Sequence, residues 1–398
     1  MSKLKKPTKL NRNVSDIGNY IGLAMKELKK SGYPLSFLKN RKKVEVWRKE
    51  AKSKVFELLS FEQKNMPLKP KIEEKFIEDG LVIERISYAL PYGRRTKGLF
   101  MYPVGSKGTL PAVVALHDHG GFKYFGKEKI VKLKNELPIL SEHKKKGYAG
   151  TGWANVLAKR GFAVLVVDTF TFGSRRVELE DLPHLYRKYL FTKKDHEILF
   201  VNKKVNSEEY VMAYNRFAGQ HEHLLAKTLF TANTTWPGVF SYEDRRSLDY
   251  LATRKEVDMK RVGCGGLSGG GLRTIFLAGL DRRIKCGVCV GFMSTFEELL
   301  TEHIKNHTWM LYVPGISKYL DMPDIISLRV PSPLMVQYDI DDDLYTLKGQ
   351  KDADKRLTAI YKKSGFSGNY SGRFYPGPHK FDLEMQSDAF DWFEKWLK

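Results

Sequence analysis

From Leu110 onward, short continuous apolar runs alternate along the chain with longer amphipathic segments. Runs of this kind are typical of central parallel strands that are covered on both faces. The alternation predicts an α/β fold, in which crossover helices flank a mostly parallel central sheet. The apolar runs are Leu110–Leu116, Phe162–Val167, Arg261–Cys264, Ile284–Val290 and Pro333–Gln337, and the helical segments include Gly152–Lys159, Tyr242–Thr253, Leu272–Leu280 and Ser387–Leu397.

The front of the chain follows a different pattern. Residues 41–60 repeat apolar side chains at spacings of three and four, which predicts an amphipathic helix. Its apolar positions are Val44, Trp47, Ala51, Val55 and Leu58. Beyond this helix, Phe76–Ile86 and Gly98–Tyr102 have the composition of β-strands, with a turn-rich stretch between them.

These patterns divide the chain into two parts. Residues 1–75 are expected to form a basic, largely helical N-terminal extension. Residues 76–398 are expected to form the α/β domain. An insertion around residues 177–235 interrupts this domain, and no periodicity assigns its elements.

The charge of the chain is concentrated at its front. The 398 residues carry a formal net charge of +22, and residues 1–75 hold 20 Lys and Arg against 8 Asp and Glu. Such a segment could contact nucleic acid, an anionic surface or an acidic partner. Because no nucleic-acid motif accompanies the charge, we interpret it as a solvated lysine-rich face. With 42% hydrophobic residues, the chain is rich enough in apolar side chains for a large core.

The sequence also bears on location and redox state. It contains no run of 18 apolar residues, so no membrane span is expected. The basic residues 1–10 are not followed by an apolar segment of signal-peptide length, so a cytoplasmic protein is expected. Three cysteines, Cys264, Cys286 and Cys289, fit buried free thiols better than disulfides or a zinc site, because no second cysteine pair is present.

A candidate nucleophile lies between a predicted strand and a predicted helix. Gly266-Leu-Ser268-Gly-Gly270 matches the pattern Gly-x-Ser-x-Gly. In this pattern the serine occupies a sharp strand-to-helix turn, and small neighbours let the chain close tightly around it. The turn exposes the hydroxyl, and the helix directs its first amides toward a developing oxyanion. Ser268 is therefore the expected nucleophile.

The acid and the base are expected after Ser268, in the order serine, acid, histidine. The acidic loop Asp339–Asp343 follows the last internal apolar run, and its chemistry alone does not decide which aspartate serves. It does not fit a calcium loop of the EF-hand type, because Leu344 stands where that loop needs glycine. His379 lies just before the terminal helix, and no histidine follows it. It is the expected base.

The segment after Leu116 suggests an oxyanion site. In His117-Asp-His119-Gly-Gly121, a glycine amide can approach a substrate carbonyl, so Gly121 and the amide of Gly269 are the expected donors. A competing interpretation is a metal site, because His117 and His119 would point the same way on a strand. No further ligands follow nearby in the sequence. Candidate pocket residues, each equally consistent with plain core, are Phe122, Trp236, Phe292, Met293 and Trp309.

Taken together, these stretches resemble the dienelactone-hydrolase-like and acetyl-xylan-esterase-like α/β-hydrolases, over about residues 75–398. The stretches that carry the resemblance are His117–Lys129, Val167–Gly173 with Arg175 and Arg176, Trp236–Leu251 leading into Val262–Gly271, Tyr312–Gly315 to Pro323–Asp324, and Pro378–Phe381 with Glu384–Gln386 and Trp392–Leu397. The resemblance implies that the acid is Asp342, which precedes Asp343, Leu344 and an aromatic residue, with Asp343 the lesser candidate. The family often has glycine where this chain has Asp339.

The resemblance implies a serine carboxylesterase that hydrolyses small acyl esters, including acetylated sugars, without a metal or organic cofactor. Dienelactone hydrolases use a cysteine nucleophile, so Ser268 favours ordinary ester hydrolysis. Three alternatives stay open at this point: a peptidase of prolyl-oligopeptidase type, a metal-dependent hydrolase built on His117 and His119, and a catalytically inert binding module. The sequence does not set the oligomeric state or the physiological substrate.

Overall fold

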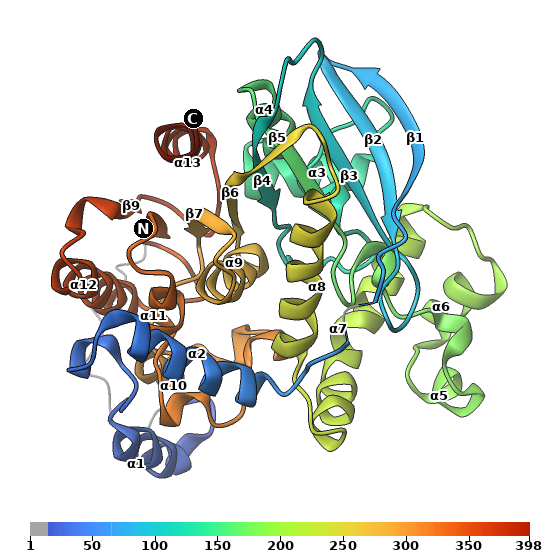
Figure 1. Ribbon diagram of the computed structural model, residues 1–398. Helices are drawn as coiled ribbons and strands as arrows, with labels where there is room; N and C mark the ends of the chain where they lie inside the picture. The colour runs from blue at the N-terminus through green and yellow to red at the C-terminus, as the bar shows by residue number, and fades with distance from the viewer. Residues whose placement is uncertain (1–14, 65) are drawn as a thin grey trace, which may run out of the picture.

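Nine strands form one sheet within residues 15–64 and 66–398, which are the residues that this computed structural model describes (Figure 1). The strand order is β1-β2-β3-β5-β4-β6-β7-β8-β9. The strands are β1 (Lys71–Glu78), β2 (Leu81–Tyr88), β3 (Thr96–Pro103), β4 (Leu110–Ala115), β5 (Ala163–Val167), β6 (Val257–Leu267), β7 (Ile284–Val290), β8 (Leu334–Asp339) and β9 (Tyr370–Tyr375).

The sheet is parallel from β5 through β4, β6, β7 and β8 to β9. The first three strands form an antiparallel meander that joins this core through the antiparallel β3–β5 pair. The expectation of a mostly parallel central sheet flanked by helices is thus confirmed. The apolar runs predicted as central strands coincide with β4, β5, β7 and β8 to within two residues at each end, and β6 is longer than expected.

The prediction of one strand over Phe76–Ile86 is wrong. The chain reverses at Asp79 and Gly80, and Glu78 pairs with Leu81 across a two-residue hairpin. Both turn residues have positive φ, of 51° and 77°. A two-residue turn of this kind favours Asp-Gly, because its backbone twist matches that of the flanking strands.

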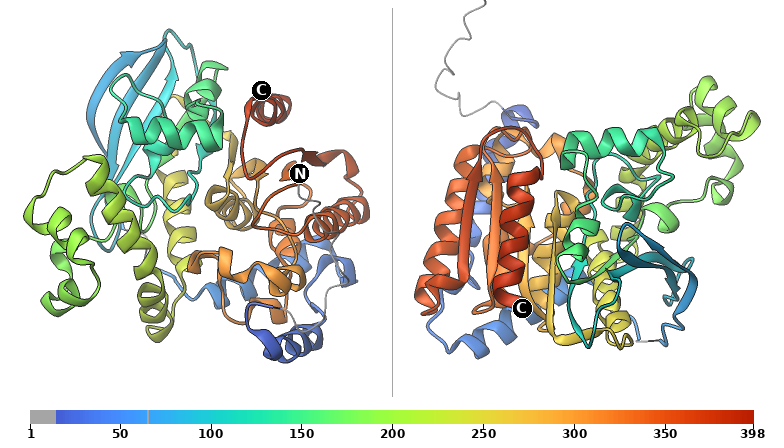
Figure 2. Two further views of the ribbon diagram at one scale, coloured as in Figure 1. Left: turned by 180° about the vertical axis from the view of Figure 1, so that it is seen from behind. Right: turned by 90° about the horizontal axis from the view of Figure 1, so that it is seen from above.

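Helices cover both faces of the sheet (Figures 1 and 2). On one face, α4 and α13 pack with Tyr148 at the end of α3 against the strands. On the other face, α8, α9, α11 and α12 enclose a second apolar layer. The helices are α1 (Ile21–Ser31), α2 (Val44–Leu59), α3 (Pro138–Tyr148), α4 (Trp153–Lys159), α5 (His184–Tyr189), α6 (Lys193–His196), α7 (Glu208–Thr231), α8 (Trp236–Leu251), α9 (Gly269–Leu280), α10 (Phe296–Glu302), α11 (Met322–Ile326), α12 (Leu347–Lys363) and α13 (Leu383–Leu397).

The amphipathic helix predicted over residues 41–60 is α2, and its apolar side belongs to the largest apolar cluster of the molecule. Trp47 is 2% exposed, and its indole N–H donates to the Leu35 carbonyl at 2.7 Å. Its neighbours Ala51 and Val55 are fully buried. The front helices therefore share the core of the sheet's covering layer, where burial of a side chain as large as Trp47 contributes about 3 kcal/mol. The first fourteen residues of the expected extension lie outside the described residues.

The insertion around residues 177–235 contains α5, α6 and the long helix α7, and it projects beside the meander (Figures 1 and 2). Its apolar side chains form a separate cluster with the segment around Tyr124, and Tyr210, Tyr214 and Phe217 of α7 lie at its centre. The three cysteines are free and fully buried in the central strands. Among the described residues, no helix combines the length and the apolar character needed to cross a lipid bilayer.

Candidate active site

Ser268 lies at the junction of β6 and α9, with φ 60° and ψ −120°. Positive φ is rare for a side chain other than glycine, and a serine held there marks a strained functional turn. The turn is fixed by its backbone: the Ser268 N–H donates to the Val290 carbonyl at 2.9 Å, and its own carbonyl accepts from Leu272 at 2.9 Å. Ser268 is half-buried, so part of the residue is open to solvent.

The two outer glycines of the motif are required by close packing. A Cβ placed on Gly266 or on Gly270 would lie 2.1 Å from the Leu116 carbonyl oxygen, a distance that no side chain tolerates. The turn therefore closes directly on the end of β4. This contact brings the segment after β4 against the start of α9, where Ser268 is found.

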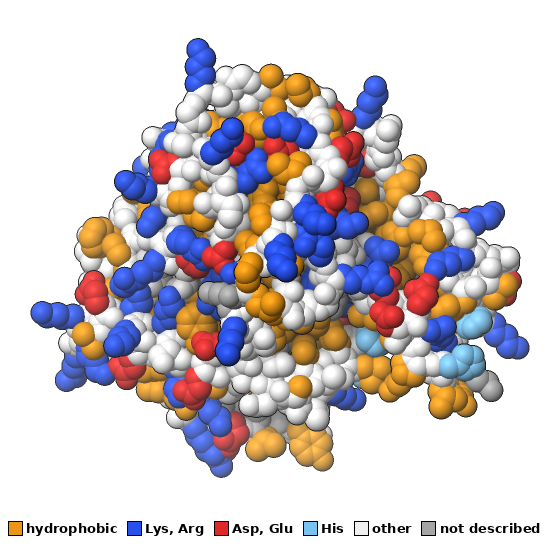
Figure 3. Space-filling view, turned by 45° about the vertical axis from the view of Figure 1, so that its right-hand side comes forward, with side chains coloured by type: hydrophobic (Ala, Val, Ile, Leu, Met, Phe, Trp, Pro, Cys, Tyr) orange, Lys and Arg blue, Asp and Glu red, His pale blue; other side chains and the backbone are white. Residues whose placement is uncertain are grey.

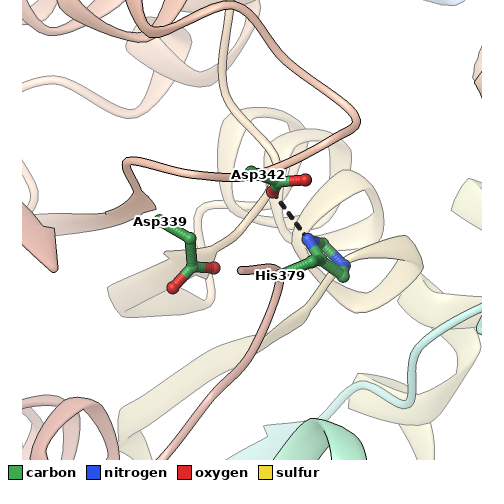
Figure 4. Close-up of side chains that lie close together, drawn as sticks. All are labelled: Asp339, Asp342 and His379. Carbon is green, nitrogen blue, oxygen red and sulfur yellow. Dashed lines mark hydrogen bonds and ion pairs between the residues drawn. The ribbon is translucent and has the colours of Figure 1, made fainter. Parts of the chain in front are cut away.

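His379 and Asp342 are joined by a hydrogen bond of 2.7 Å between the imidazole Nδ1 and the carboxylate Oδ2 (Figure 4). The second carboxylate oxygen accepts from the Leu344 N–H at 2.8 Å, so both oxygens of the fully buried Asp342 carboxylate are oriented. Burial lowers the pKa of His379, but the hydrogen bond and charge of Asp342 outweigh it and leave that pKa raised. The other ring nitrogen, Nε2, is buried and has no partner among the described residues.

The acidic loop contributes one carboxylate to this pair. Asp342 contacts His379, whereas Asp343 is exposed and directs its backbone carbonyl to Asn306. Asp339 lies nearby (Figure 4), where burial raises its pKa to about 7. Its carboxylate accepts from the Lys380 N–H at 3.2 Å. At pH 7 a pKa of about 7 leaves about half of Asp339 protonated, and Asp342 is the carboxylate that bonds the imidazole.

The His379 ring packs beside the serine turn. A Cβ placed on Gly291, just after β7, would lie 3.0 Å from Cε1 of His379 and 2.9 Å from a methyl group of Leu267. Leu267 directly precedes Ser268, so the ring and the serine turn share this glycine as a neighbour. The three expected residues thus follow the carboxyl ends of β6, β8 and β9, which is the edge where open α/β sheets bind ligands.

The expectation that the Gly121 amide faces the substrate does not fit the hydrogen bonding. Its N–H donates to Nδ1 of His119 at 3.0 Å and is therefore occupied. The His119 backbone nitrogen lies beside the serine turn, because a Cβ on Gly269 would be 2.7 Å from that nitrogen. Neither the His119 N–H nor the Gly269 N–H has an acceptor among the described residues.

The side chain of His119 is held by Glu222 of α7, a residue that no motif or periodicity singles out. Nε2 of His119 lies 2.6 Å from the Glu222 carboxylate, and Nδ1 accepts from Gly121, so the proton belongs on Nε2 and the ring is neutral. Burial lowers the pKa of His119, although Glu222 opposes the shift. The same carboxylate accepts from Lys123 at 2.7 Å.

The second oxygen of Glu222 accepts from the Thr308 hydroxyl at 2.7 Å and from the Trp309 N–H at 3.1 Å. Burial raises the pKa of Glu222, but its bonds with His119 and Lys123 outweigh this and hold it well below its usual range. One buried carboxylate therefore ties the insertion to the segment after β4 and to the segment before α11. A sequence signal for it is absent, because Glu222 lies 103 residues from His119.

The metal-site interpretation of His117 and His119 gains no support from their geometry. Both nitrogens of His119 have protein partners, and Nδ1 of His117 lies 3.0 Å from the Asp118 carbonyl. Within the described ranges, the only group of three side chains with metal-ligating spacing is Asp339, Asp342 and His379. In that group, His379 already bonds Asp342.

Of the five candidate pocket residues, Phe122, Trp236, Phe292 and Met293 are buried core side chains. Trp309 differs, because its side chain is 39% exposed while its backbone is fixed by Glu222. Its ring lies 6.4 Å from Phe230 at the end of α7 and 6.0 Å from Tyr312. Trp309 is the member of the set whose side chain is open to solvent.

Comparison with known proteins agrees with this architecture. A solved structure from Bacteroides fragilis NCTC 9343, provisionally named an acetyl xylan esterase, superposes with a TM-score of 0.66 at 18% identity, covering 91% of this chain and 84% of that one. A glucuronoyl esterase from Solibacter usitatus gives 0.59 at 13% identity, covering 87% and 91%. The chain has the α/β-hydrolase fold.

The same hydrolase fold is seen in a CE15 esterase from a marine bacterial metagenome, with a TM-score of 0.55 at 14% identity over 87% of this chain and 90% of that one. At the level of sequence, YtaP of Bacillus subtilis (strain 168), whose name gives it provisionally as a hydrolase, is 25% identical over 356 residues. The match covers 88% of this chain and all of YtaP. No protein-family profile matches the chain.

Proposed function

We propose that this protein is a serine carboxylesterase with Ser268 as nucleophile, His379 as general base and Asp342 as the acid that orients it. The observation that carries the proposal is the His379–Asp342 hydrogen bond of 2.7 Å, whose imidazole leaves Nε2 unpartnered beside a serine turn with φ 60°. A base oriented by a buried carboxylate, next to a serine on a strained turn, is the arrangement that activates a hydroxyl for attack.

In the proposed reaction, Nε2 of His379 takes the proton of the Ser268 hydroxyl as its oxygen attacks the ester carbonyl. Asp342 keeps the proton of the neutral ring on Nδ1 and stabilises the imidazolium that forms. The imidazolium then returns the proton to the departing alcohol, and an acyl group stays on Ser268. Water, deprotonated by His379 in the same way, releases the acid and restores the enzyme.

The oxyanion of the tetrahedral intermediate is assigned to two backbone amides, those of Gly269 and His119. Gly269 is the first residue of α9, so its N–H has no acceptor within the helix and carries the positive end of the helix dipole. The His119 N–H lies against Gly269. This assignment replaces Gly121, whose amide is used by the His119 ring.

Small acyl esters are the proposed substrates, and acetylated sugars are the first class to test within them. The support is the names of structural neighbours, acetyl xylan esterase and glucuronoyl esterase, and the partly exposed side chain of Trp309. Aromatic faces bind apolar surfaces well while one edge stays in water. The division into a front extension of residues 1–75 and a catalytic domain of residues 76–398, and the absence of a cofactor requirement, belong to the same proposal.

The proposal is tested by hydrolysis of p-nitrophenyl acetate by the wild type and by Ser268→Ala, each with and without EDTA. We expect an active wild type that is indifferent to EDTA and a Ser268→Ala variant weakened at least about 10³-fold. Labelling with a fluorophosphonate should add one mass increment, located on Ser268. Activity that is lost with EDTA and kept in Ser268→Ala would transfer the chemistry to a metal site.

A matched pair tests the acid. Asp342→Asn is expected to lower kcat about 10³- to 10⁴-fold, because the ring loses its tautomer and its counter-charge. Asp343→Asn changes the next residue, which is exposed, and should keep wild-type activity. Equal losses in both variants would contradict the assignment. A wild type that is inert toward a panel of small esters would favour the binding-module alternative, and cleavage of peptides in preference to esters would favour the peptidase.

A further inference from the structure

The peptide group that joins Asp118 to His119 has different surroundings at its two polar ends. Its nitrogen, which belongs to His119, lies beside Gly269 and the serine turn. Its carbonyl oxygen, which belongs to Asp118, points to the interior and receives two donors. These donors are the ammonium of Lys129 and Nδ1 of His117, the latter at 3.0 Å. A single peptide unit thus lies between the proposed oxyanion and a buried positive charge.

The ammonium of Lys129 contacts this carbonyl more closely than it contacts a carboxylate. Its side chain is fully buried, and its ammonium bonds the Asp118 carbonyl and, at 3.2 Å, the His119 carbonyl. The Asp118 carboxylate is farther away, at 3.5 Å. That carboxylate has other partners, since it accepts from the Tyr148 hydroxyl at 2.6 Å and lies 3.2 Å from Nε2 of His143.

His117 acts on the same carbonyl as a neutral donor. Burial lowers its pKa well below the usual range, and the charges of Lys129 and Arg273 add to the shift. A neutral imidazole carries one proton, and the Asp118 carbonyl at Nδ1 fixes that proton on Nδ1. The carbonyl therefore accepts one charged and one neutral hydrogen bond.

Donors on a carbonyl strengthen the N–H of the same peptide as a donor, because they draw charge through the amide group. Condensed-phase estimates put this strengthening at about 10–30% per bond. The ammonium adds a direct attraction for an oxyanion on the far side of the peptide, and its burial prevents screening by solvent. Lys129 therefore stabilises the negatively charged tetrahedral intermediate more than the neutral bound ester. A group that stabilises the charged state more strongly lowers the barrier of the chemical step.

We propose that Lys129 is a positioning residue of the oxyanion site, which polarises the Asp118–His119 peptide with the help of His117 and so strengthens the His119 N–H toward the tetrahedral intermediate. The inference rests on the proposed esterase function and on the contacts of Lys129 with the Asp118–His119 peptide. Lys129 does not touch the substrate; it acts through the peptide.

The test compares Lys129→Met, which keeps the volume and removes both charge and donor, with Lys129→Gln, which keeps a neutral donor. Loss of one oxyanion donor costs about 10²- to 10³-fold, and here the donor itself remains. We therefore expect kcat to fall about 10- to 100-fold in Lys129→Met and less in Lys129→Gln, with KM within about threefold of the wild type. Affinity for a trifluoromethyl ketone, which forms a tetrahedral adduct on Ser268, should fall by the same factor as kcat/KM.

Lys144→Met is the matched control. Lys144 is also fully buried and paired with a carboxylate, Glu136, but its ammonium makes no hydrogen bond to the Asp118–His119 peptide among the described residues. Its loss should lower stability and leave kcat of the folded enzyme unchanged. Equal loss of kcat in both methionine variants, or wild-type kcat in Lys129→Met, would overturn the inference.

A second readout is the pH profile of kcat. The charged groups that act on Lys129 are Asp118, Asp168 and Arg273, with the neutral His117 beside it, and burial lowers the pKa of Lys129 to about 8. The wild type should lose kcat as pH rises through this value while its circular dichroism stays native, and Lys129→Met should lack this alkaline step. If Lys129→Met does not fold, Lys129→Gln decides by the same criteria. Failure of the proposed esterase function is distinguished from failure of this inference by the Ser268→Ala variant, which would remain active only if Ser268 is not the nucleophile.

Discussion

Replacing Glu222 by glutamine removes the carboxylate that accepts four hydrogen bonds and supports the segment after β4. Its partners are His119 at 2.6 Å, Lys123 at 2.7 Å, Thr308 at 2.7 Å and the Trp309 N–H at 3.1 Å. A glutamine amide has one acceptor oxygen and an NH₂ group. The NH₂ group would face donors on one side, and no rotation of the amide relieves both sides.

The magnitude follows from burial. Glu222 is 7% exposed, and removing one partner of a buried ionic pair costs about 3–5 kcal/mol because the other charge is left without compensation. For 398 residues the entropy of unfolding is about 0.8 kcal/mol per degree, so Tm should fall by about 4–6 °C. The pKa of Glu222 is held low in the folded protein. Its stabilisation is therefore present above the unfolded pKa of about 4.3 and is lost as pH falls below it.

Thermal unfolding followed by circular dichroism at pH 7 and again near pH 3 measures both effects, and p-nitrophenyl acetate hydrolysis follows the site. We expect a lower Tm at pH 7, a smaller difference at pH 3, and a reduced kcat because His119 loses its anchor. Glu208→Gln on the same helix is the control, since Glu208 is exposed and should change stability by under about 1 kcal/mol. A Glu222→Gln Tm within 1 °C of the wild type at pH 7 would refute the reasoning.

Three further outcomes are expected. The raised pKa of His379 should place the acidic midpoint of kcat/KM above the ordinary histidine value of about 6.5, and a midpoint below about 6 would contradict the assignment. The stability that His379 contributes should be present below about pH 6.5 and lost as pH rises through its folded pKa. Gly266→Ala should abolish activity, because its Cβ would lie 2.1 Å from the Leu116 carbonyl, whereas Gly219→Ala on α7, with open space around it, should be harmless by activity and Tm. Trp47→Ala should destabilise the protein by about 3–5 kcal/mol in urea unfolding if α2 folds with the sheet, and by far less if it does not.

The sequence was most informative where a motif fixes the backbone. Gly266 and Gly270 flank Ser268 for a reason that is visible in the contacts with Leu116, and the strand before and the helix after could be recognised from their patterns. The choice of Asp342 came from the family resemblance, since four aspartates share its loop and chemistry alone did not separate them. The hydrogen bond to His379 agrees with that choice.

The oxyanion donor was harder to predict from the sequence, because its identity depends on which backbone N–H has no other hydrogen-bond acceptor. Glycine at position 121 suggested a close approach, but a side chain two residues earlier captures its N–H. Sequence patterns do not report such captures. Glu222 was not predicted for a related reason. It lies in an insertion without periodic strands, and its partners come from segments distant in the sequence. The hairpin at Asp79-Gly80, by contrast, carried a readable turn signal that a strand prediction over both arms overlooked.

The three buried cysteines give the protein an internal reporter. Burial raises the pKa of each thiol, so at neutral pH Cys264, Cys286 and Cys289 hold almost no thiolate and are shielded from reagents. Alkylation can proceed only when the central strands separate. Its rate therefore measures how often the sheet opens, without any label. Because the three native thiols do not react in the folded protein, a single cysteine introduced on the surface of the insertion could be labelled selectively. A dye attached there would report on motion of the insertion alone.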